Sequence, residues 1–476
     1  MRERRRTSPA GGQRMHPSLR DAEPAVFWLD TPDAPEPGSG LTTGAATDLL
    51  IVGAGYTGLW AAIQAKERDP DRDVLVVEGD SVAAHASGRN GGFVDASITH
   101  GLANGVAHFP DEVARLEALG RENFAAIAAA IEAYGIDARF EPNGGLHVAT
   151  APWQVADLRA DLALLDAHGV AYEWLERDAL RACVASPTYE AGVRIADGQA
   201  IVDPARLAWG LADVARSLGV RIAERTRAVR IDSTRTELRV ATSGGTVRAR
   251  AVLLATNARS HLVRATRRRV VPVWDYVLVS EPLGPAQRDA IGWRGREGIS
   301  DAANQFHYYR LTADDRILWG GYDAVYYRGG DIAEARSQRM ATFAVLARHF
   351  FATFPQLEGM RFTHRWGGVI DTSSRFCVTF GRAHQGRVSY AVGYTGLGVA
   401  ASRFGARVAL DLLDEPGSDL TRLEFVRRAP FPFPPEPLRS AAIAMTRRAI
   451  ARADDHGGRR GAWLRLLDAF GVGFDS

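Results

Sequence analysis

Short apolar runs alternate with amphipathic stretches along the first part of this chain. Residues 48–52 form an apolar run with the length and branched side chains of a buried parallel strand. Good helix formers follow over residues 59–68, and a second apolar run occupies residues 74–77. This order predicts a strand, a helix and a second strand, and therefore an α/β unit that begins at about residue 46.

The rest of the chain continues this alternation and then changes character. Residues 228–231, 237–242 and 246–250 are typical of a three-stranded meander, which a separate buried strand at 251–255 follows. Between residues 267 and 362 the pattern favours long strands rich in aromatic residues, in an antiparallel sheet. The other predicted helices cover residues 111–134, 154–168, 204–218, 332–354 and 399–413, and the other predicted strands cover residues 144–149, 220–222, 270–280, 304–310, 316–322 and 389–392.

The first predicted strand ends in the motif Gly53-x-Gly55-x-x-Gly58. Gly53 permits a tight turn, Gly55 lets the backbone approach a pyrophosphate, and Gly58 lets the helix pack closely on the strand. The helix N-terminus then directs its free N–H groups at the phosphates. Glu78 ends the next strand twenty residues after Gly58, where a carboxylate accepts hydrogen bonds from an adenosine ribose. A glycine triplet alone is typical of many tight turns, but the strand, helix, second strand and terminal Glu together predict dinucleotide binding.

Further turns rich in small residues follow other predicted strands. Residues 85–93 (HASGRNGGF) suit either a flexible surface turn or a backbone that lies against a flat ring system, with Arg89 and Asn90 as polar contacts. Their position just after the ribose-binding strand favours the second interpretation. Residues 393–398 again place a glycine turn before a helix N-terminus, where developing negative charge would be stabilised. The meander and the strand that ends at Thr256 exceed what a nicotinamide-binding domain needs, and they point to FAD.

The aromatic region contains the candidate substrate residues. Alternate residues of a strand share one face, so Tyr309 should face opposite to Tyr308 and Arg310, and one of these faces should line a cavity. Aromatic packing under a half-buried sheet explains most of the neighbouring rings. An arginine in such an apolar wall needs a partner because an unpaired buried charge is costly. A substrate carboxylate, or a neighbouring Asp or backbone carbonyl, would each satisfy Arg310.

Composition narrows the possible partners. The chain has 476 residues, 46% hydrophobic and 24% charged, which is ordinary for a globular protein of two or three domain-sized units. The formal net charge of +2 argues against a nucleic-acid partner. The sequence has no apolar run of 18 or more residues and no secretory signal, so we expect no transmembrane helix and a cytoplasmic location. Cys183 and Cys377 lack metal-ligand or redox spacing, so we expect buried apolar roles and no metal site.

The two ends of the chain lie outside these motifs. Residues 1–12 are expected to form a disordered tail, and residues 22–44 an extended lead-in that docks Phe27 and Trp28 on the folded body. Residues 416–476 begin with a proline-rich linker and continue with two amphipathic segments. We favour packing of this tail on the body over docking at a membrane surface. The apolar stripe of the last segment consists of Trp463, Leu466, Leu467 and Phe470.

Taken together, the segments DLLIVGAGYTGL, VLVVE, ASGRNGGF, AVLLATNA, RWGGVIDT and AVGYTGLGV resemble the FAD-dependent amine and amino-acid oxidases, the family of D-amino-acid oxidase, glycine oxidase and sarcosine oxidase. Their order and spacing are most similar to the branch that holds gamma-glutamylputrescine oxidase. The resemblance implies an α/β fold with a discontinuous, Rossmann-like FAD-binding domain and a substrate domain that has a mixed or antiparallel sheet and helices. The implied segments are a lead-in at 1–45, FAD-binding segments at 46–100, 196–270 and 361–415, substrate-domain segments at 101–195 and 271–360, and a helical tail at 416–476.

The resemblance also assigns residues. Tyr309, Arg310 and Trp366 are the candidates for substrate binding and catalysis. Relatives with covalent flavin use a Cys or His at a defined position, which neither Cys377 nor His85 matches, so noncovalent FAD is implied. The residues implied in FAD binding are Gly53, Ala54, Gly55, Tyr56, Thr57, Gly58, Glu78, Ser87, Gly88, Arg89, Asn90, Gly91, Gly92, Val229, Thr256, Asn257, Gly393, Thr395, Gly396, Leu397 and Gly398.

The implied reaction is oxidation of the C–N bond of a small-molecule amine or amino acid, with hydride transfer to flavin and hydrolysis of the resulting imine. The electron acceptor would be oxygen or a quinone. An alternative enzyme is a flavin dehydrogenase of a hydroxy acid or glycerol 3-phosphate, which a concentration of Arg and Lys at the pocket would support. An alternative of another class is a tRNA-modifying or binding flavoprotein without oxidase chemistry, against which the near-neutral charge argues.

Overall fold

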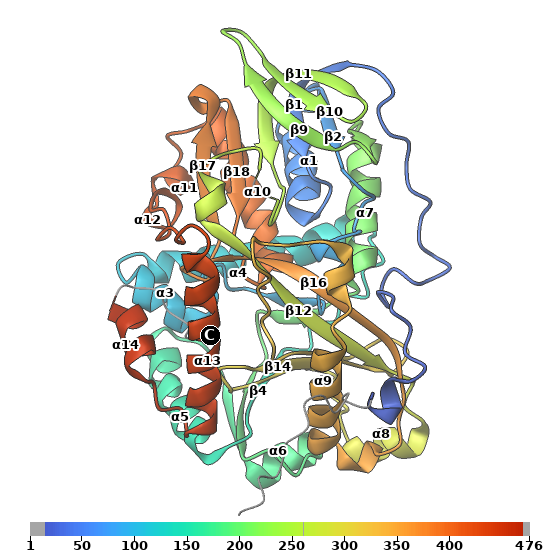
Figure 1. The fold of residues 1–476 in the computed structure, drawn as a ribbon, viewed down its shortest axis with the longest axis vertical. Coiled ribbons are helices and arrows are strands. Elements are labelled where there is room, and N and C mark those ends of the chain that lie inside the picture. Colours follow the sequence, from blue (N-terminus) through green and yellow to red (C-terminus); the bar gives the residue numbers. More distant parts are fainter. Residues whose placement is uncertain (1–14, 260, 470–476) are drawn as a thin grey trace, which may run out of the picture.

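The computed structural model describes residues 15–259 and 261–469. Its core consists of two eight-stranded sheets, with the glycine-turn sheet in the upper half of Figure 1 and the aromatic sheet in the lower half. Both sheets take strands from widely separated segments, so the chain crosses between the two halves several times. This arrangement is the α/β fold that the sequence predicts.

The first sheet has the predicted strand–helix–strand unit at its centre. β1 (Ala45–Val52) pairs in parallel with β2 (Val74–Val77) on one side and with β11 (Gly245–Leu254) on the other. Their registers align Val52 with both Val77 and Leu254, so the carboxyl ends of the three strands open at one edge. The full order is β17 (Thr379–Ala383), β18 (Val388–Val392), β11, β1, β2 and β8 (Arg221–Ala223), with β10 (Leu238–Thr242) paired to β11 and β9 (Ala228–Ser233) paired to β10.

One prediction about this sheet is wrong. The third meander strand and the buried strand that was expected after it form a single strand, β11. The ladder with β1 continues past the expected break, because Ala249 pairs with Thr47 and Ala251 pairs with Leu49.

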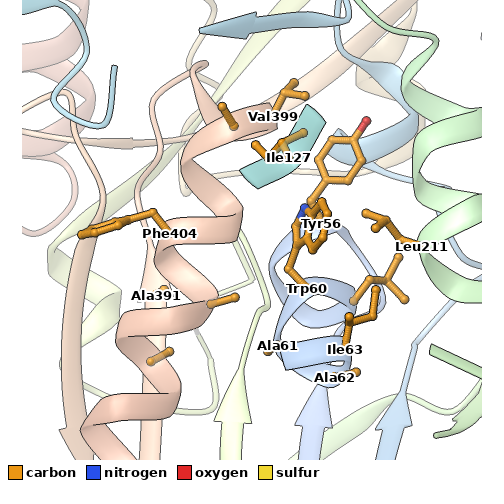
Figure 2. Close-up of a cluster of buried hydrophobic side chains, with 14 of the residues drawn as sticks. Tyr56, Trp60, Ala61, Ala62, Ile63, Ile127, Leu211, Ala391, Val399 and Phe404 are labelled. Carbon is orange, nitrogen blue, oxygen red and sulfur yellow. The ribbon is translucent and has the colours of Figure 1, made fainter. Parts of the chain in front are cut away.

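Three helices pack together on this sheet. α1 (Tyr56–Arg68) lies between α7 (Pro204–Ser217) and α10 (Gly398–Asp414), and Figure 2 shows Trp60 of α1 between Leu211 of α7 and Val399 of α10. All three of these side chains are buried. Full burial of a large apolar side chain contributes roughly 1.5 to 3 kcal/mol, so this cluster fixes α1 and the glycine turn that precedes it.

The second sheet has the order β16, β12, β15, β14, β13, β4, β6, β5. β12 (Val270–Ser280) pairs antiparallel with β16 (Phe362–Ser373) along its whole length. β16 therefore belongs to the aromatic sheet, and the start of the third FAD-binding segment at residue 361 stays a prediction. The helix predicted from residue 332 is also shorter, since α9 (Met340–Thr353) follows a 3-10 turn at Glu334–Ser337. The remaining strands are β4 (Gly145–Ala149), β5 (Glu173–Glu176), β6 (Ala191–Ile195), β13 (Gly298–Asp301), β14 (His307–Leu311) and β15 (Ile317–Gly321).

Further elements lie outside these two sheets. β3 (Phe93–Asp95) and β7 (Gln199–Ile201) form a separate antiparallel pair. The other helices are α2 (Ala86–Arg89), α3 (Leu102–His108), α4 (Val113–Ala133), α5 (Pro152–Ala167), α6 (Arg177–Cys183), α8 (Pro285–Ile291), α11 (Asp419–Arg422) and α12 (Glu424–Arg427), and further 3-10 turns lie at Pro17–Leu19, Thr266–Arg268, Pro355–Leu357 and His384–Gly386.

Both ends of the described chain pack on the body. In the lead-in, Trp28 is buried and the ring of Phe27 meets His364 edge-on, as predicted. The tail forms α13 (Leu438–Asp455) and α14 (Ala462–Ala469). Leu464 is the buried leucine of α14, whereas Leu466 is exposed, so the predicted stripe is displaced. Residues 1–14 and Phe470, which carry other predictions, lie outside the described residues.

Among the helices of residues 15–259 and 261–469, none combines the length and the apolar character that a membrane crossing requires.

Candidate functional site

A cavity of about 1250 Å³ lies between the two sheets. Its wall combines the carboxyl ends of β1 and β2, the turns that follow them, one face of the second sheet, and the tail helices α13 and α14. Most small-molecule pockets measure about 300 to 1,000 Å³. The cavity therefore has room for a dinucleotide together with a small substrate.

The first glycine motif shapes one end of this cavity. Gly53 has a φ of +109°, and a Cβ on it would lie 2.4 Å from the carbonyl oxygen of Ala255. A Cβ on Gly58 would lie 1.9 Å from the carbonyl oxygen of Gly53, so only glycine allows this approach of helix to strand. Gly55 is the N-cap of α1 and provides no capping side chain. The N–H of Tyr56 donates to Ser87 Oγ at 3.0 Å, and the rest of the helix N-terminus is open toward the cavity. This is the arrangement that binds a pyrophosphate.

Glu78 stands beside this turn at the end of β2. Its Oε2 accepts the backbone N–H of Ala54 at 2.8 Å, and its Oε1 accepts the N–H of Asp80 at 2.9 Å. Burial raises the pKa of Glu78. The carboxylate lies on the cavity wall with its orientation fixed, as a ribose-binding group requires.

Most residues predicted to bind FAD line the cavity, and a few lie behind its wall. Those behind the wall include Gly58, Gly88, Gly92 and Gly393. Val229 is 58% exposed and off the wall, which its neighbours Arg227 and Ala228 form, so the expected contact of its backbone with adenine stays a prediction. The predicted residues on the wall are Gly53, Ala54, Gly55, Tyr56, Thr57, Glu78, Ser87, Arg89, Asn90, Gly91, Thr256, Asn257, Thr395, Gly396, Leu397 and Gly398.

Asn257 provides an independent sign of a bound group. Its carboxamide Oδ1 is buried without a hydrogen-bond partner in the described part of the chain. A buried acceptor that stays unpaired costs about 1 to 3 kcal/mol, and a ligand that donates a hydrogen bond would remove this cost. Together with the open helix terminus and the fixed Glu78, this residue fits FAD.

Residues from outside the first sheet support the turn at 87–92. The indole Nε1 of Trp28 donates to the carbonyl oxygen of Asn90 at 2.9 Å. Trp366, in β16, donates to the carbonyl oxygen of Arg89, also at 2.9 Å. Trp366 is buried and lies outside the cavity wall, so its predicted catalytic role is replaced by a positioning role.

The side chain of Arg310 also supports the turn at 87–92. Its guanidinium donates to the carbonyl oxygens of Val202 and Gly92 and lies 5.4 Å from the centre of the Trp28 ring. Burial lowers its pKa to about 10, so it stays charged at neutral pH. Because Arg310 is 1% exposed and off the cavity wall, backbone carbonyls and not a substrate carboxylate are its partners.

Tyr309 is also not placed at the cavity. Its hydroxyl hydrogen-bonds to that of Tyr189 at 2.7 Å, and its ring stacks on Trp319 in the core of the second sheet. Tyr308, on the opposite face of β14, lies on the cavity wall instead. Of the two faces left open by the sequence, the one that carries Tyr308 faces the cavity.

The structure adds an acidic pair that the sequence reasoning missed. Tyr308 donates its hydroxyl hydrogen to the carboxylate of Asp275 on β12, and both residues lie on the cavity wall. Burial raises the pKa of Asp275 to about 6. The ring of Tyr308 also lies close to Gly91, so the pair stands next to the turn expected to carry the flavin ring. The signal in the sequence was a single acid inside the apolar strand VVPVWDYVLVS.

A second polar cluster was also missed. The amide group of Gln199 donates to Asp95 Oδ2 at 2.8 Å and lies 3.3 Å from His147 Nε2, while His147 Nδ1 lies 2.8 Å from Ser300 Oγ. All four residues line the cavity. Burial lowers the pKa of His147, so its ring is neutral at physiological pH. The cluster offers a neutral imidazole and a carboxylate on the substrate side.

The turn at 393–398 is held by a buried acid. Asp371 Oδ1 accepts the backbone N–H of Tyr394 at 3.2 Å, and its Oδ2 accepts that of Gly393 at 2.5 Å. Burial raises the pKa of Asp371 to about 7. The carboxylate thereby fixes the glycine turn that precedes α10.

Comparisons with known proteins agree with this geometry. A family model described as FAD dependent oxidoreductase matches residues 48–412. Gamma-glutamylputrescine oxidoreductase of Escherichia coli (strain K12) is 32% identical over 393 residues, which cover 81% of this chain and 88% of that protein.

Solved structures show the same fold at lower identity. L-proline dehydrogenase from P. horikoshii superposes with a TM-score of 0.66 at 16% identity and covers 80% of this chain and 96% of its own. Glycine oxidase from Geobacillus kaustophilus has a TM-score of 0.65 at 20% identity and covers 81% of this chain and 99% of its own.

Proposed function

The chain belongs to the family of FAD-dependent oxidoreductases, and from this premise we propose that it oxidises the C–N bond of an amine or amino acid. FAD, when bound, supplies the acceptor for the hydride that leaves the amine-bearing carbon. The residues of this chain bind and orient the substrate and exclude water. The imine that leaves the site then hydrolyses to a carbonyl compound and ammonia or a smaller amine.

The observation that carries this proposal is the Asp275–Tyr308 pair on the cavity wall. With a pKa of about 6, Asp275 is ionised at neutral pH and attracts the amino group of a substrate. Tyr308 packs close to Gly91, so an amine held by this pair would lie beside the turn at 87–92. Asp275 is thus the group that we assign to amine binding.

The charges of the cavity favour an amine over a phosphate or a hydroxy acid. Arg227 lies near Gly79, and the positive charge of Arg259 lowers the pKa of Glu78. Both arginines therefore belong to the end of the cavity where Glu78 is expected to bind the adenosine ribose. On the substrate side, Arg89 is paired with Glu334 at 2.8 Å, and Arg447 of the tail is paired with Asp323. This is not the concentration of Arg and Lys that a glycerol 3-phosphate site would need. The formal net charge of +2 also gives no support to a tRNA-binding flavoprotein.

The finer parts of the proposal concern substrate and cofactor attachment. The relative in Escherichia coli is named for gamma-glutamylputrescine, so a chain with an amine at one end and an acid group at the other is the first substrate class to test. We propose noncovalent FAD, because Cys377 is buried outside the cavity wall and His85, which lies on the wall, does not match the position at which relatives attach flavin. Oxygen or a quinone is the proposed electron acceptor.

The proposal is tested by product analysis on the FAD-loaded protein. A panel of amines and amino acids should yield the corresponding carbonyl compound and ammonia or amine in equal amounts. Asp275→Asn should lower kcat/KM for the best amine about 10- to 150-fold, since a hydrogen bond to a charged group is worth about 1.5 to 3 kcal/mol. Asp232→Asn, at an exposed pair in β9, is the matched control and should leave kcat/KM unchanged. Turnover of hydroxy acids but of no amine would refute the proposal.

A further inference from the structure

Part of the cavity wall comes from the C-terminal tail, beyond residue 412, where the match to the family model ends. Figure 1 shows α13 beside the second sheet, with α14 next to it. The tail contributes apolar side chains and one guanidinium to the wall. These include Ile443, Ile450, Trp463, Leu467 and Arg447.

Hydrogen bonds hold this part of the wall in place. Asp454, near the end of α13, accepts the backbone N–H groups of Asn304 and Gln305, both at 3.0 Å. The indole Nε1 of Trp463 donates to Thr446 Oγ1 at 2.9 Å and ties α14 to α13. The tail is therefore fixed to the loop between β13 and β14, which also lines the cavity.

The guanidinium of Arg447 has an N–H donor that no described residue accepts. It pairs with Asp323, and the same carboxylate also lies 3.6 Å from Arg339. One carboxylate shared by two guanidinium groups leaves one positive charge uncompensated within this group. In addition, the Nε of Arg447 is buried without a hydrogen-bond partner in the described part of the chain. An anion that entered the cavity would satisfy both the charge and the donor.

Arg447 and the Asp275–Tyr308 pair belong to different elements of the cavity wall. Tyr308 is paired with Gly320 in the ladder between β14 and β15. Asp323, the partner of Arg447, lies three residues further along the chain, beyond the end of β15. The cavity wall thus has an acid on β12, beside the turn at 87–92, and a base on α13, together with apolar residues of the tail.

We propose that the cavity selects amines whose carbon chain ends in a carboxylate, and that Arg447 binds this carboxylate. The proposal deepens the proposed function and rests on it. A carboxylate can accept two N–H groups of one guanidinium, which gives both charge and direction. Apolar tail side chains such as Ile443 and Ile450 would cover the methylene groups between the two ends. The substrate specificity of this chain then resides partly in a segment that the family model does not include.

The competing explanation is that the ion pair between Arg447 and Asp323 only stabilises the packing of α13 on the second sheet. The experiment compares ω-amino acids of four to six carbons with alkylamines of the same length, on the FAD-loaded protein. In the wild type, the carboxylate should raise kcat/KM at the best length by roughly 10- to 100-fold. Arg447→Gln should remove this preference and change the rate with alkylamines little. Arg447→Lys should retain part of it, because it keeps the charge but not the planar fork.

The control is Arg448→Gln, since Arg448 is the next residue of α13 and is exposed off the cavity wall. It should behave as the wild type with both substrate series. An equal loss of kcat/KM for both series in Arg447→Gln would show that the residue only pins the helix, and would overturn the proposal. Absence of a carboxylate preference in the wild type would overturn it as well.

A binding measurement separates failure of this proposal from failure of the proposed function. Hexanoate carries the carboxylate but no amine, and it should perturb the visible spectrum of bound FAD in the wild type and in Arg448→Gln. Its dissociation constant should rise at least roughly 10-fold in Arg447→Gln. If no amine is oxidised but this difference holds, the proposed function fails and the carboxylate site stands. If amines are oxidised and hexanoate binds both proteins equally, the carboxylate site fails alone.

Discussion

The indole Nε1 of Trp366 donates to the main-chain carbonyl oxygen of Arg89 at 2.9 Å. Trp366 belongs to β16 of the second sheet, whereas Arg89 ends the short helix α2 that follows β2 of the first sheet. One hydrogen bond therefore joins the two halves of the molecule at the turn expected to carry the flavin ring. Trp28 makes the equivalent bond to Asn90 from the lead-in.

We predict that Trp366→Phe weakens FAD binding. The substitution removes the hydrogen bond to Arg89 and leaves an aromatic ring in place, so the turn at 87–92 loses about 0.5 to 1.5 kcal/mol of support. The dissociation constant of FAD, measured by titration of the deflavinated protein, should rise roughly 2- to 13-fold.

The matched control is Trp319→Phe. Trp319 is equally buried, but its Nε1 has no hydrogen-bond partner in the described residues. This variant should lose stability through the smaller ring without a specific loss of FAD affinity. Equal FAD affinity in Trp366→Phe and Trp319→Phe would contradict the role of the Trp366–Arg89 bond.

We predict that Arg310→Met destabilises the protein and lowers its FAD content. The substitution leaves the carbonyl oxygen of Val202 without the guanidinium donor and removes the charge that packs on Trp28. The free energy of unfolding should fall by about 1 to 3 kcal/mol, measured by urea denaturation.

Arg230→Met is the control, because Arg230 is 71% exposed and pairs with Asp232 at the surface of β9. It should unfold like the wild type. If Arg310→Met kept its stability and FAD but showed a raised KM for a carboxylate-bearing amine, Arg310 would be a substrate residue after all.

We predict that Asp371 makes stability depend on pH. Burial raises its pKa to about 7 in the folded protein, from an ordinary value of 3.8. A carboxyl with a raised folded pKa contributes stability that is present below pH 4 and lost as pH rises through 7. Between pH 5 and 8 the free energy of unfolding of the wild type should therefore fall by about 2 to 3 kcal/mol relative to Asp371→Asn.

The measurement is urea unfolding of the FAD-free wild type and variant at both pH values. The comparison with Asp371→Asn cancels other titrating groups, including Asp275. A difference between the two proteins that stays constant from pH 5 to 8 would rule out a raised pKa at this carboxyl.

We predict that acid precipitation releases all of the flavin as FAD. Cys377 is 2% exposed and off the cavity wall, and burial raises the pKa of its thiol, so it is not available as a thiolate at neutral pH. The thiol of Cys183 also lies off the cavity wall, where it accepts a hydrogen bond from Arg194 of β6 in the second sheet. Flavin absorbance that remained in the washed pellet would show a covalent link.

The first glycine motif could be predicted from the sequence because its chemistry is local. The turn at Gly53 and the acid at Glu78 need only a strand, a helix and a second strand in order, and neighbouring residues fix all three. The same is true of the glycine turn before α10. The docking of Trp28 followed from two aromatic residues in a lead-in that is rich in Pro, Gly and Thr.

The substrate side could not be predicted in the same way. Tyr308 and Arg310 share one face of β14, two residues apart. Tyr308 lines the cavity, whereas the guanidinium of Arg310 packs against Gly92. Which position of a strand meets a cavity depends on the elements that pack over it. The amphipathic pattern of α13 likewise shows that one face is covered, but not that the covered face borders a cavity. Asp275 was the available signal, because it is a single acid in an otherwise apolar strand.

The central claim is that this cavity oxidises amines with FAD, and anaerobic reduction of the bound flavin tests it most directly. The FAD-loaded protein is mixed without oxygen with a carboxylate-bearing amine, or with the hydroxy compound of the same carbon skeleton, and the visible absorbance of the flavin is followed. We predict that the amine bleaches the flavin fully, with one carbonyl product formed per flavin, while the hydroxy compound and glycerol 3-phosphate leave it oxidised. Bleaching by a hydroxy acid or by glycerol 3-phosphate, with no amine able to reduce the flavin, would contradict the account.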